Sequence, residues 1–178
     1  MLGGRTMIKL AITGGIGSGK SYIARQMTQL LGIPVYDSDA NAKRLNEEND
    51  GIRQGLVTLV GSGVYDAKGH LDKAVLASFL FSSEENASKV NALVHPVVKA
   101  DFLRWAEEQD APVVAIETAL LAESGIDRIV DKVIRVDAPL ETRIHRAMQR
   151  DSVSREKVLE RMARQKQYPN PDIIINNV

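Results

Sequence analysis

Several features that mark other protein classes are missing from this chain. It has no cysteine, which excludes a disulfide framework and a thiolate metal site, so a metal would have to bind carboxylates, hydroxyls or phosphate oxygens. Its 23 basic and 23 acidic residues cancel, which gives no electrostatic reason to expect a nucleic acid or an anionic membrane as partner. No apolar run approaches the roughly 20 residues of a membrane span. We therefore expect a cytoplasmic protein.

The length and composition favour a single domain. The 178 residues, 44% of them hydrophobic and 26% charged, can bury a full core. Met1–Thr6 lacks the apolar stretch of a secretory signal, and we expect it to precede the folded core. No internal repeat or low-complexity tract is visible.

Apolar runs with strand character alternate with helical patterns over much of the chain. This alternation predicts an α/β fold with a mostly parallel sheet of about five strands covered by helices on both faces. The strands are expected at 8–12, 33–36, 112–116, 132–136 and 173–175. Residues 51–110 show no clear strand pattern and predict a helical lobe inserted between the two parts of the core, 7–50 and 111–178.

Two local signals are predicted inside the helical lobe. Ser82 and Glu85 have the spacing of a capping box at a helix N-terminus. His95-Pro96 is expected to break the helical run, which then resumes at Val97. A histidine before a proline is more often a structural hydrogen-bonding residue than a ligand.

Residues Gly14 to Ser21 fit the phosphate-loop pattern G-x-x-x-x-G-K-[ST], between an apolar strand and an amphipathic helix. Glycines let successive backbone N–H groups turn onto phosphate oxygens at the positive end of that helix. Lys20 is placed to reach the β- and γ-phosphates, and the Ser21 hydroxyl to coordinate Mg²⁺. A glycine-rich turn with an incidental lysine is the alternative, but the flanking elements favour a nucleoside triphosphate site.

Acidic residues end two predicted strands at the sheet edge that carries the loop. Asp37, close to its strand, suits Mg²⁺-bound water, whereas Asp39 lies further out toward the helical lobe and suits the proton of an alcohol acceptor. Capping of the following helix is the competing interpretation for Asp39. For Glu117 we favour a structural role over a water-mediated contact with the metal.

Three arginines share one face of the helix that follows Pro139. Arg146 and Arg150 follow Arg143 by three and by seven positions. Such a face is either a solvated surface balanced by neighbouring acids or part of a lid, at about 139–165, that brings guanidinium groups to a transferring phosphoryl group. On the second interpretation, Arg146, Arg150 or both approach the phosphates in the closed state.

With these motifs in hand, the chain resembles the dephospho-CoA kinases over nearly its whole length. The residues that carry the resemblance, in order, are Thr13 to Ser21, Asp37 with Asp39, Gly69-His70-Leu71-Asp72, His95-Pro96, Leu120-Leu121 with Glu123, Gln149-Arg150-Asp151, Asp172 and Asn176-Asn177. The chain departs from the family at Ala119 and Ala122, within the usual Pro-Leu-Leu-Phe-Glu, and at Lys73, within the usual Leu-Asp-Arg. Family members commonly continue past the asparagines, so part of the adenine side is expected beyond Val178.

The resemblance implies a P-loop NTPase-type three-layer fold and transfer of the γ-phosphoryl group of ATP, with Mg²⁺, to the ribose 3′-hydroxyl of dephospho-CoA. It marks Asp39 as the base, with Lys20, Arg146 and Arg150 as further catalytic residues. The nucleotide contacts that we expect are Gly15, Ile16, Gly17, Ser18, Gly19, Lys20, Ser21, Asn176 and Asn177. The expected acceptor contacts are Asp39, His95, Leu120 and Glu123, with the helical lobe holding the CoA moiety, and the expected metal ligands are Ser21 and Asp37. The oligomeric state stays undecided.

Three other functions were compared with this one. A kinase for a nucleoside monophosphate or a sugar acid would share everything except the acceptor region. A regulatory GTPase is less consistent, because Asp66 to Gly69 matches a D-x-x-G element but no N-K-x-D segment occurs. A nucleotide-binding module without catalysis would not need the Asp37/Asp39 pair.

Overall fold

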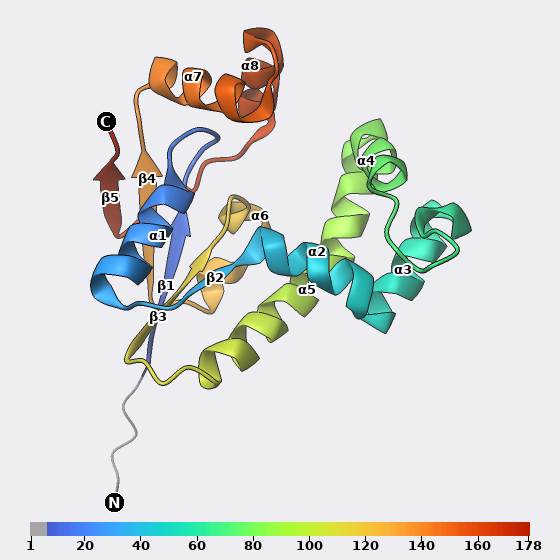
Figure 1. Ribbon diagram of the computed structural model, residues 1–178, viewed down its shortest axis with the longest axis horizontal. Coiled ribbons are helices and arrows are strands. Elements are labelled where there is room, and N and C mark those ends of the chain that lie inside the picture. Colours follow the sequence, from blue (N-terminus) through green and yellow to red (C-terminus); the bar gives the residue numbers. More distant parts are fainter. Residues whose placement is uncertain (1–6) are drawn as a thin grey trace, which may run out of the picture. The chain divides into compact units, whose positions relative to one another are not determined.

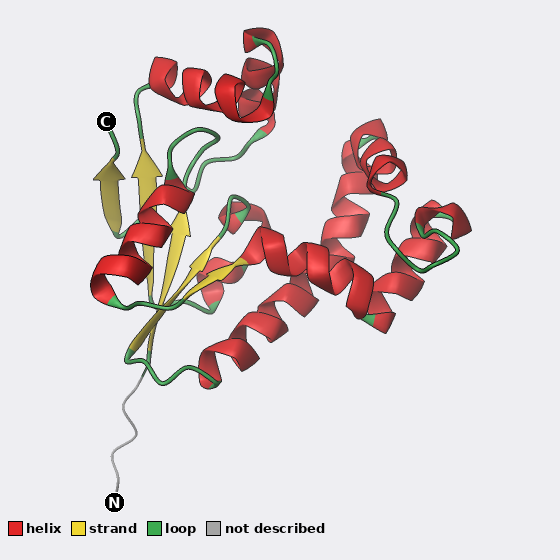
Figure 2. Ribbon diagram, in the orientation of Figure 1, coloured by secondary structure: helices red, strands yellow, loops and turns green. Residues whose placement is uncertain are grey.

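A computed structural model, which describes residues 7–178, shows an α/β fold built on one parallel sheet (Figures 1 and 2). The expectation for Met1–Thr6 lies outside the described residues. The five strands, in the spatial order β2-β3-β1-β4-β5, are β1 (Ile8–Thr13), β2 (Val35–Asp37), β3 (Val113–Glu117), β4 (Lys132–Asp137) and β5 (Ile173–Asn176). Every pairing is parallel. The predicted fold class is confirmed, and each strand lies within about two residues of its expected position.

The described chain divides into two compact units. The core unit contains the sheet and comprises the residues up to Asp37 and from Trp105 onward, and the helical unit is Ser38–Arg104. The helices are α1 (Lys20–Leu31), α2 (Ser38–Glu48), α3 (Asp50–Val60), α4 (Lys73–Ser82), α5 (Glu84–Glu107), α6 (Leu121–Ser124), α7 (Leu140–Asp151) and α8 (Arg155–Arg164), with short 3₁₀ turns η1 (Ser62–Val64) and η2 (Ile126–Arg128). None of the described helices is long and apolar enough to cross a membrane.

Both faces of the sheet are buried at its centre. On β1, Ala11 and Ile12 point to opposite faces because side chains alternate along a strand, and both are fully buried. Ala115 and Ile116 on β3 repeat this pattern. On one face, Ile12 and Ala115 pack with Ala24 of α1, which runs alongside the sheet in Figure 1. A sheet buried on both faces holds the ends of its strands in fixed positions, which is what a site at those ends requires.

The expected break at His95-Pro96 is wrong. The helix α5 continues through Pro96 from Glu84 to Glu107. A proline inside a helix removes one backbone hydrogen bond, and that loss is tolerated here because buried side chains hold the helix on both sides of it. These side chains recur at intervals of four residues: Val90, Val94, Val98 and Phe102.

Two predicted helix starts also need correction. The cap of α5 is Ser83, whose Oγ accepts a hydrogen bond from the Asn86 N–H at 3.1 Å, whereas Ser82 is the last residue of α4. The helix α2 begins at Ser38, so Asp39 lies inside the first turn and does not precede the helix as a cap would. A carboxylate in the first turn still interacts favourably with the helix dipole.

Candidate active site

The phosphate loop connects β1 to α1, as predicted. It turns in the left-handed region at Gly17 and Gly19, with φ angles of +75° and +87°. A Cβ atom on Gly17 would lie 2.1 Å from the backbone oxygen of Arg143, so the position excludes a side chain on steric grounds as well as conformational ones. The loop therefore needs glycine both for its own shape and for the approach of α7.

The helices α7 and α8 pack on the first half of the loop. Ile16 contacts a small hydrophobic core formed by Ile144, Ala147 and Val158. Arg143 Nε donates a hydrogen bond to the Ile16 carbonyl oxygen at 3.0 Å. In Figure 1 the two helices lie beyond the ends of β1 and β4, next to the loop. The segment predicted as a lid is thus fastened to the loop by apolar and polar contacts together.

The second half of the loop is held by Asn177, the residue that follows the C-terminal strand. The Asn177 side-chain Nδ2 donates to the Ser18 carbonyl oxygen at 3.0 Å, while the main-chain carbonyl oxygen of Asn177 accepts from Arg146 Nη1 at 3.2 Å. The Asn177 N–H also donates to the Asp137 carbonyl oxygen at 2.8 Å. Asn177 thereby joins the loop, the arginine helix and the end of β4. Asn176 lies one residue earlier, at the end of β5, in register with Asp137.

An acidic corner lies where α1 begins. Ser21 Oγ donates to Glu117 Oε1 at 2.5 Å, and Lys20 Nζ lies 3.9 Å from the same oxygen. Both charged side chains are largely buried, with 15% of Lys20 and 12% of Glu117 exposed. Asp37 ends β2 in register with Glu117 on β3, so the two carboxylates occupy adjacent strand ends.

This corner suits a hard cation. Mg²⁺ is typically held by one or two carboxylates together with substrate phosphate oxygens and water, and Ser21, Asp37 and Glu117 supply a hydroxyl and two carboxylates. Within residues 7–178, no group of three or more acidic or histidine side chains gathers as a metal site made by protein alone. The donor set therefore fits a metal that is bound together with phosphate.

The structural role favoured for Glu117 agrees with its contacts, because it binds Ser21 and Lys20 at the start of α1. Sequence reasoning missed one residue at the loop. It overlooked Gln165, which follows α8: its Oε1 accepts from the Ile16 N–H at 2.8 Å, and its Nε2 lies 3.3 Å from the Ala119 carbonyl oxygen. No local pattern announces a contact between residues 149 positions apart.

A small cavity opens beside the start of the loop. It measures about 160 Å³, and its lining includes Gly14, Gly15 and the basic residues Arg135, Arg143 and Lys166. Arg135 is neutralised by an ion pair with Asp137 at 3.0 Å. The remaining positive charge favours an anion next to the loop.

The predicted residues do not all gather at this loop. Arg146 lies beside Gly19 and Asn177, whereas the guanidinium of Arg150 binds the neighbouring Asp151 at 2.7 Å and is 61% exposed. Leu120 and Glu123 lie at the start of α6 in the core unit. Asp39 and His95 belong to the helical unit, on α2 and in the middle of α5.

A phosphate loop beneath an arginine-bearing pair of helices, on a five-stranded parallel sheet, defines a P-loop kinase. The model of the dephospho-CoA kinase family matches residues 8–177, and the chain belongs to that family.

Individual relatives agree with this assignment. A dephospho-CoA kinase from Porphyromonas gingivalis is 48% identical over 89% of this chain and 78% of its own. A crystal structure of a Thermus thermophilus protein is 35% identical, with a TM-score of 0.82 over 97% of this chain and 89% of its own. The structure of a dephospho-CoA kinase from Campylobacter jejuni, at 22% identity, shares the fold with a TM-score of 0.63 over 95% of this chain and 87% of its own.

Proposed function

We propose that this protein phosphorylates the ribose 3′-hydroxyl of dephospho-CoA with ATP and Mg²⁺, giving CoA and ADP, in the cytoplasm. Family membership along residues 8–177 supports the choice of acceptor. The observation that carries the chemistry is the cluster of Lys20, Ser21 and Glu117 at the phosphate loop. A lysine and a hydroxyl held at the first turn of α1 are what the triphosphate and its metal require.

The donor side follows from the loop. The phosphates lie against the loop from Gly15 to Ser21. They accept from backbone N–H groups other than those of Ile16 and Ser18, which donate to Gln165 and to the Gly15 carbonyl oxygen. Lys20 neutralises the oxygens between the β- and γ-phosphates. Ser21, Asp37 and Glu117 would hold Mg²⁺, which draws negative charge from the phosphates when it is bound. Asn176 and Asn177 border the remainder of the nucleotide. Glu117 pairs with Lys20, so the lysine that receives the triphosphate is already oriented.

On the acceptor side we assign the base to Asp39. The 3′-oxygen forms a bond to Pγ while the bond from Pγ to the bridging oxygen of ADP breaks, and the hydroxyl proton passes to the Asp39 carboxylate. Asp39 follows Asp37 by two residues in the chain and lies in the first turn of α2. His95, Leu120 and Glu123 would contact the acceptor.

Guanidinium groups complete the arrangement. Arg146 lies beside Gly19 and can spread its charge over the γ-phosphoryl oxygens through paired donors. Arg150 would have to leave Asp151 to join it when the lid closes.

The test incubates the protein with ATP, Mg²⁺ and dephospho-CoA and detects CoA by mass spectrometry. Nucleoside monophosphates and sugar acids, offered in parallel, cover the alternative acceptors. CoA formation with little transfer to the other compounds is the expected result. Preferential phosphorylation of one of the others would reassign the substrate while keeping the kinase.

The role of Asp39 is tested separately. Asp39→Asn should retain ATP and acceptor affinity but lose most of kcat in single-turnover assays, because asparagine cannot take the proton. Asp37→Asn, measured beside it, should mainly raise the Mg²⁺ concentration needed for turnover. A normal rate in Asp39→Asn with a collapsed rate in Asp37→Asn would move the base to Asp37.

A further inference from the structure

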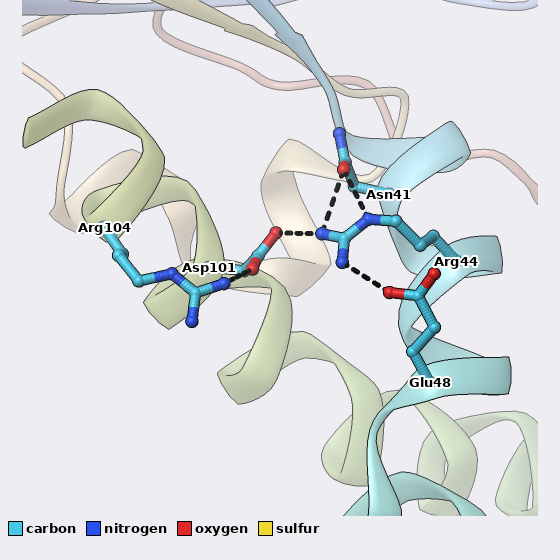
Figure 3. Close-up of polar contacts among 5 residues, drawn as sticks. All are labelled: Asn41, Arg44, Glu48, Asp101 and Arg104. Carbon is cyan, nitrogen blue, oxygen red and sulfur yellow. Dashed lines mark hydrogen bonds and ion pairs between the residues drawn. The ribbon is translucent and has the colours of Figure 1, made fainter. Parts of the chain in front are cut away.

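Within the helical unit, a group of polar side chains joins α2 to α5 (Figure 3). Arg44 of α2 donates from Nη2 to Asp101 Oδ2 of α5 at 2.6 Å. The other carboxylate oxygen, Oδ1, accepts from Arg104, one turn along α5. Asn41 and Glu48, both on α2, contact the Arg44 guanidinium at 3.2 Å and 2.9 Å.

Because Asp101 is buried, its contact with Arg44 requires a well-defined geometry. The Asp101 side chain is 7% exposed, whereas Arg44 is 40% exposed. A carboxylate removed from water has to be matched by a cation and by donors in good geometry, since an unpaired buried charge is costly. The flanking contacts to Asn41 and Glu48 hold the guanidinium fork in place before it meets α5. The pair is therefore a directional contact between two helices, unlike a mobile surface ion pair.

Apolar packing alone fixes α2 only weakly. Among its residues, Ser38 and Leu45 are the buried ones, so its hydrophobic stripe amounts to a single large side chain. A polar helix with so narrow a stripe can rotate about its axis unless polar contacts prevent it. Arg44 supplies such a contact, one residue before Leu45. Other polar contacts to α2 reach its last turn, where the Tyr65 hydroxyl donates to the Asn46 carbonyl oxygen and Arg53 Nη1 to that of Glu47. Arg44 and Leu45 are therefore the contacts nearer the first turn that limit the rotation of α2 within the helical unit.

Asp39 shares this helix with Arg44. The two residues are five positions apart, about 7.5 Å along the axis of a rigid helix. Whatever fixes the rotation of α2 also fixes the direction in which the Asp39 carboxylate leaves the first turn. We propose that the Arg44–Asp101 pair is a positioning pair that orients Asp39 for proton transfer. This inference rests on the base assignment made above.

The chain offers a matched control. Arg44→Met removes the guanidinium that reaches α5 and leaves Asp101 with Arg104, so the buried carboxylate retains a counter-ion and the fold is expected to survive. Arg104→Met also removes a guanidinium from Asp101, but that contact lies within α5. Only the first variant should raise amide hydrogen exchange in the first turns of α2. This readout does not depend on catalysis.

In turnover assays, Arg44→Met should lower kcat by about 10- to 100-fold with an unchanged KM for ATP, because misplacing a reacting group by about 1 Å costs factors of this size. Arg104→Met should turn over close to wild type. Arg44→Lys retains one donor without the fork and should fall between them.

A double-mutant cycle distinguishes positioning from general destabilisation. If Arg44 acts through Asp39, Arg44→Met should cause little further loss of kcat in an Asp39→Asn background. The same fold-loss in both backgrounds would overturn the proposal, as would wild-type kcat in Arg44→Met. Wild-type turnover in Asp39→Asn would overturn it together with the base assignment, while CoA formation by the wild-type protein would still support the proposed reaction.

Discussion

Adding a single methyl group at Gly17 tests whether α7 rests on the phosphate loop as described. In Gly17→Ala, the left-handed φ of +75° costs an L side chain about 1–2 kcal/mol. The new Cβ would lie 2.1 Å from the Arg143 carbonyl oxygen, closer than real Cβ atoms approach any heavy atom. Relieving that contact means moving the loop or α7 by about 1 Å, and overpacking of this kind costs a further 1–3 kcal/mol, roughly.

The sum of about 2–5 kcal/mol corresponds to a fall in Tm of about 4–20 °C, because 1 kcal/mol shifts a chain of this length by about 2–4 °C. Gly32→Ala is the matched control, since Gly32 has a φ of +65° with no heavy atom within 4 Å of an added Cβ. Gly32→Ala has only the conformational cost, so its Tm should fall by about 2–8 °C.

Thermal unfolding followed by circular dichroism measures both variants, and calorimetric titration with a non-hydrolysable ATP analogue measures binding. Gly17→Ala should melt below Gly32→Ala and bind the analogue more weakly, whereas Gly32→Ala should bind like the wild type. Equal melting temperatures for the two variants would refute the reasoning, because they would show that α7 exerts no pressure on the loop.

Three further outcomes are expected. Lys20→Ala should lower kcat/KM by on the order of 10²–10³ while the protein still unfolds cooperatively, and near-normal turnover would remove the loop from the mechanism. Arg146→Lys should lower kcat about tenfold, the worth of one charge-assisted hydrogen bond, and normal turnover in both Arg146→Lys and Arg150→Lys would leave the arginine helix without a role in transfer. Arg150 holds the pKa of Asp151 below its usual range, so this carboxylate stabilises the fold above the unfolded pKa near 3.9 and loses that effect as the pH falls through the lower folded value. Asp151→Asn should therefore lower Tm at pH 7 and by progressively less as the pH falls below about 3.9 in a series of melting curves; a difference independent of pH would contradict this.

The strands and the loop that the sequence predicted correctly are those that depend on a local residue pattern. Val113 to Glu117 is a short β-branched run, and period and composition suffice to identify it as a buried strand. The phosphate loop is equally local, since its glycines, Lys20 and Ser21 are contiguous. Both predictions hold because the forces that determine them act within a few residues.

The features that could not be predicted depend on contacts between distant parts of the chain. A proline breaks most helices, but at Pro96 the buried side chains of α5 outweigh the lost hydrogen bond. Which side chains of α5 are buried is known only once the elements packed against the helix are known. The Asn177 and Gln165 side chains bind loop atoms 159 and 149 positions away. Polar contacts of this kind have no period in the sequence, so the ligands that hold the loop emerge only from the fold.

Ile16 gives the phosphate loop a second role, because its side chain contributes to the hydrophobic core of α7 and α8. Ile16 of the anion-binding segment packs against buried side chains of both α7 and α8, so a change in the shape of the loop alters the packing of that helix pair. Nucleotide binding to the loop and the packing of α7 against α8 are then thermodynamically linked. If a bound nucleotide improves that packing, then by reciprocity every side chain that packs around Ile16 contributes to nucleotide affinity. One of these side chains is Val158, which lies on α8 and does not contact phosphate. Tuning of nucleotide affinity in this chain is consequently open to purely apolar substitutions within α8.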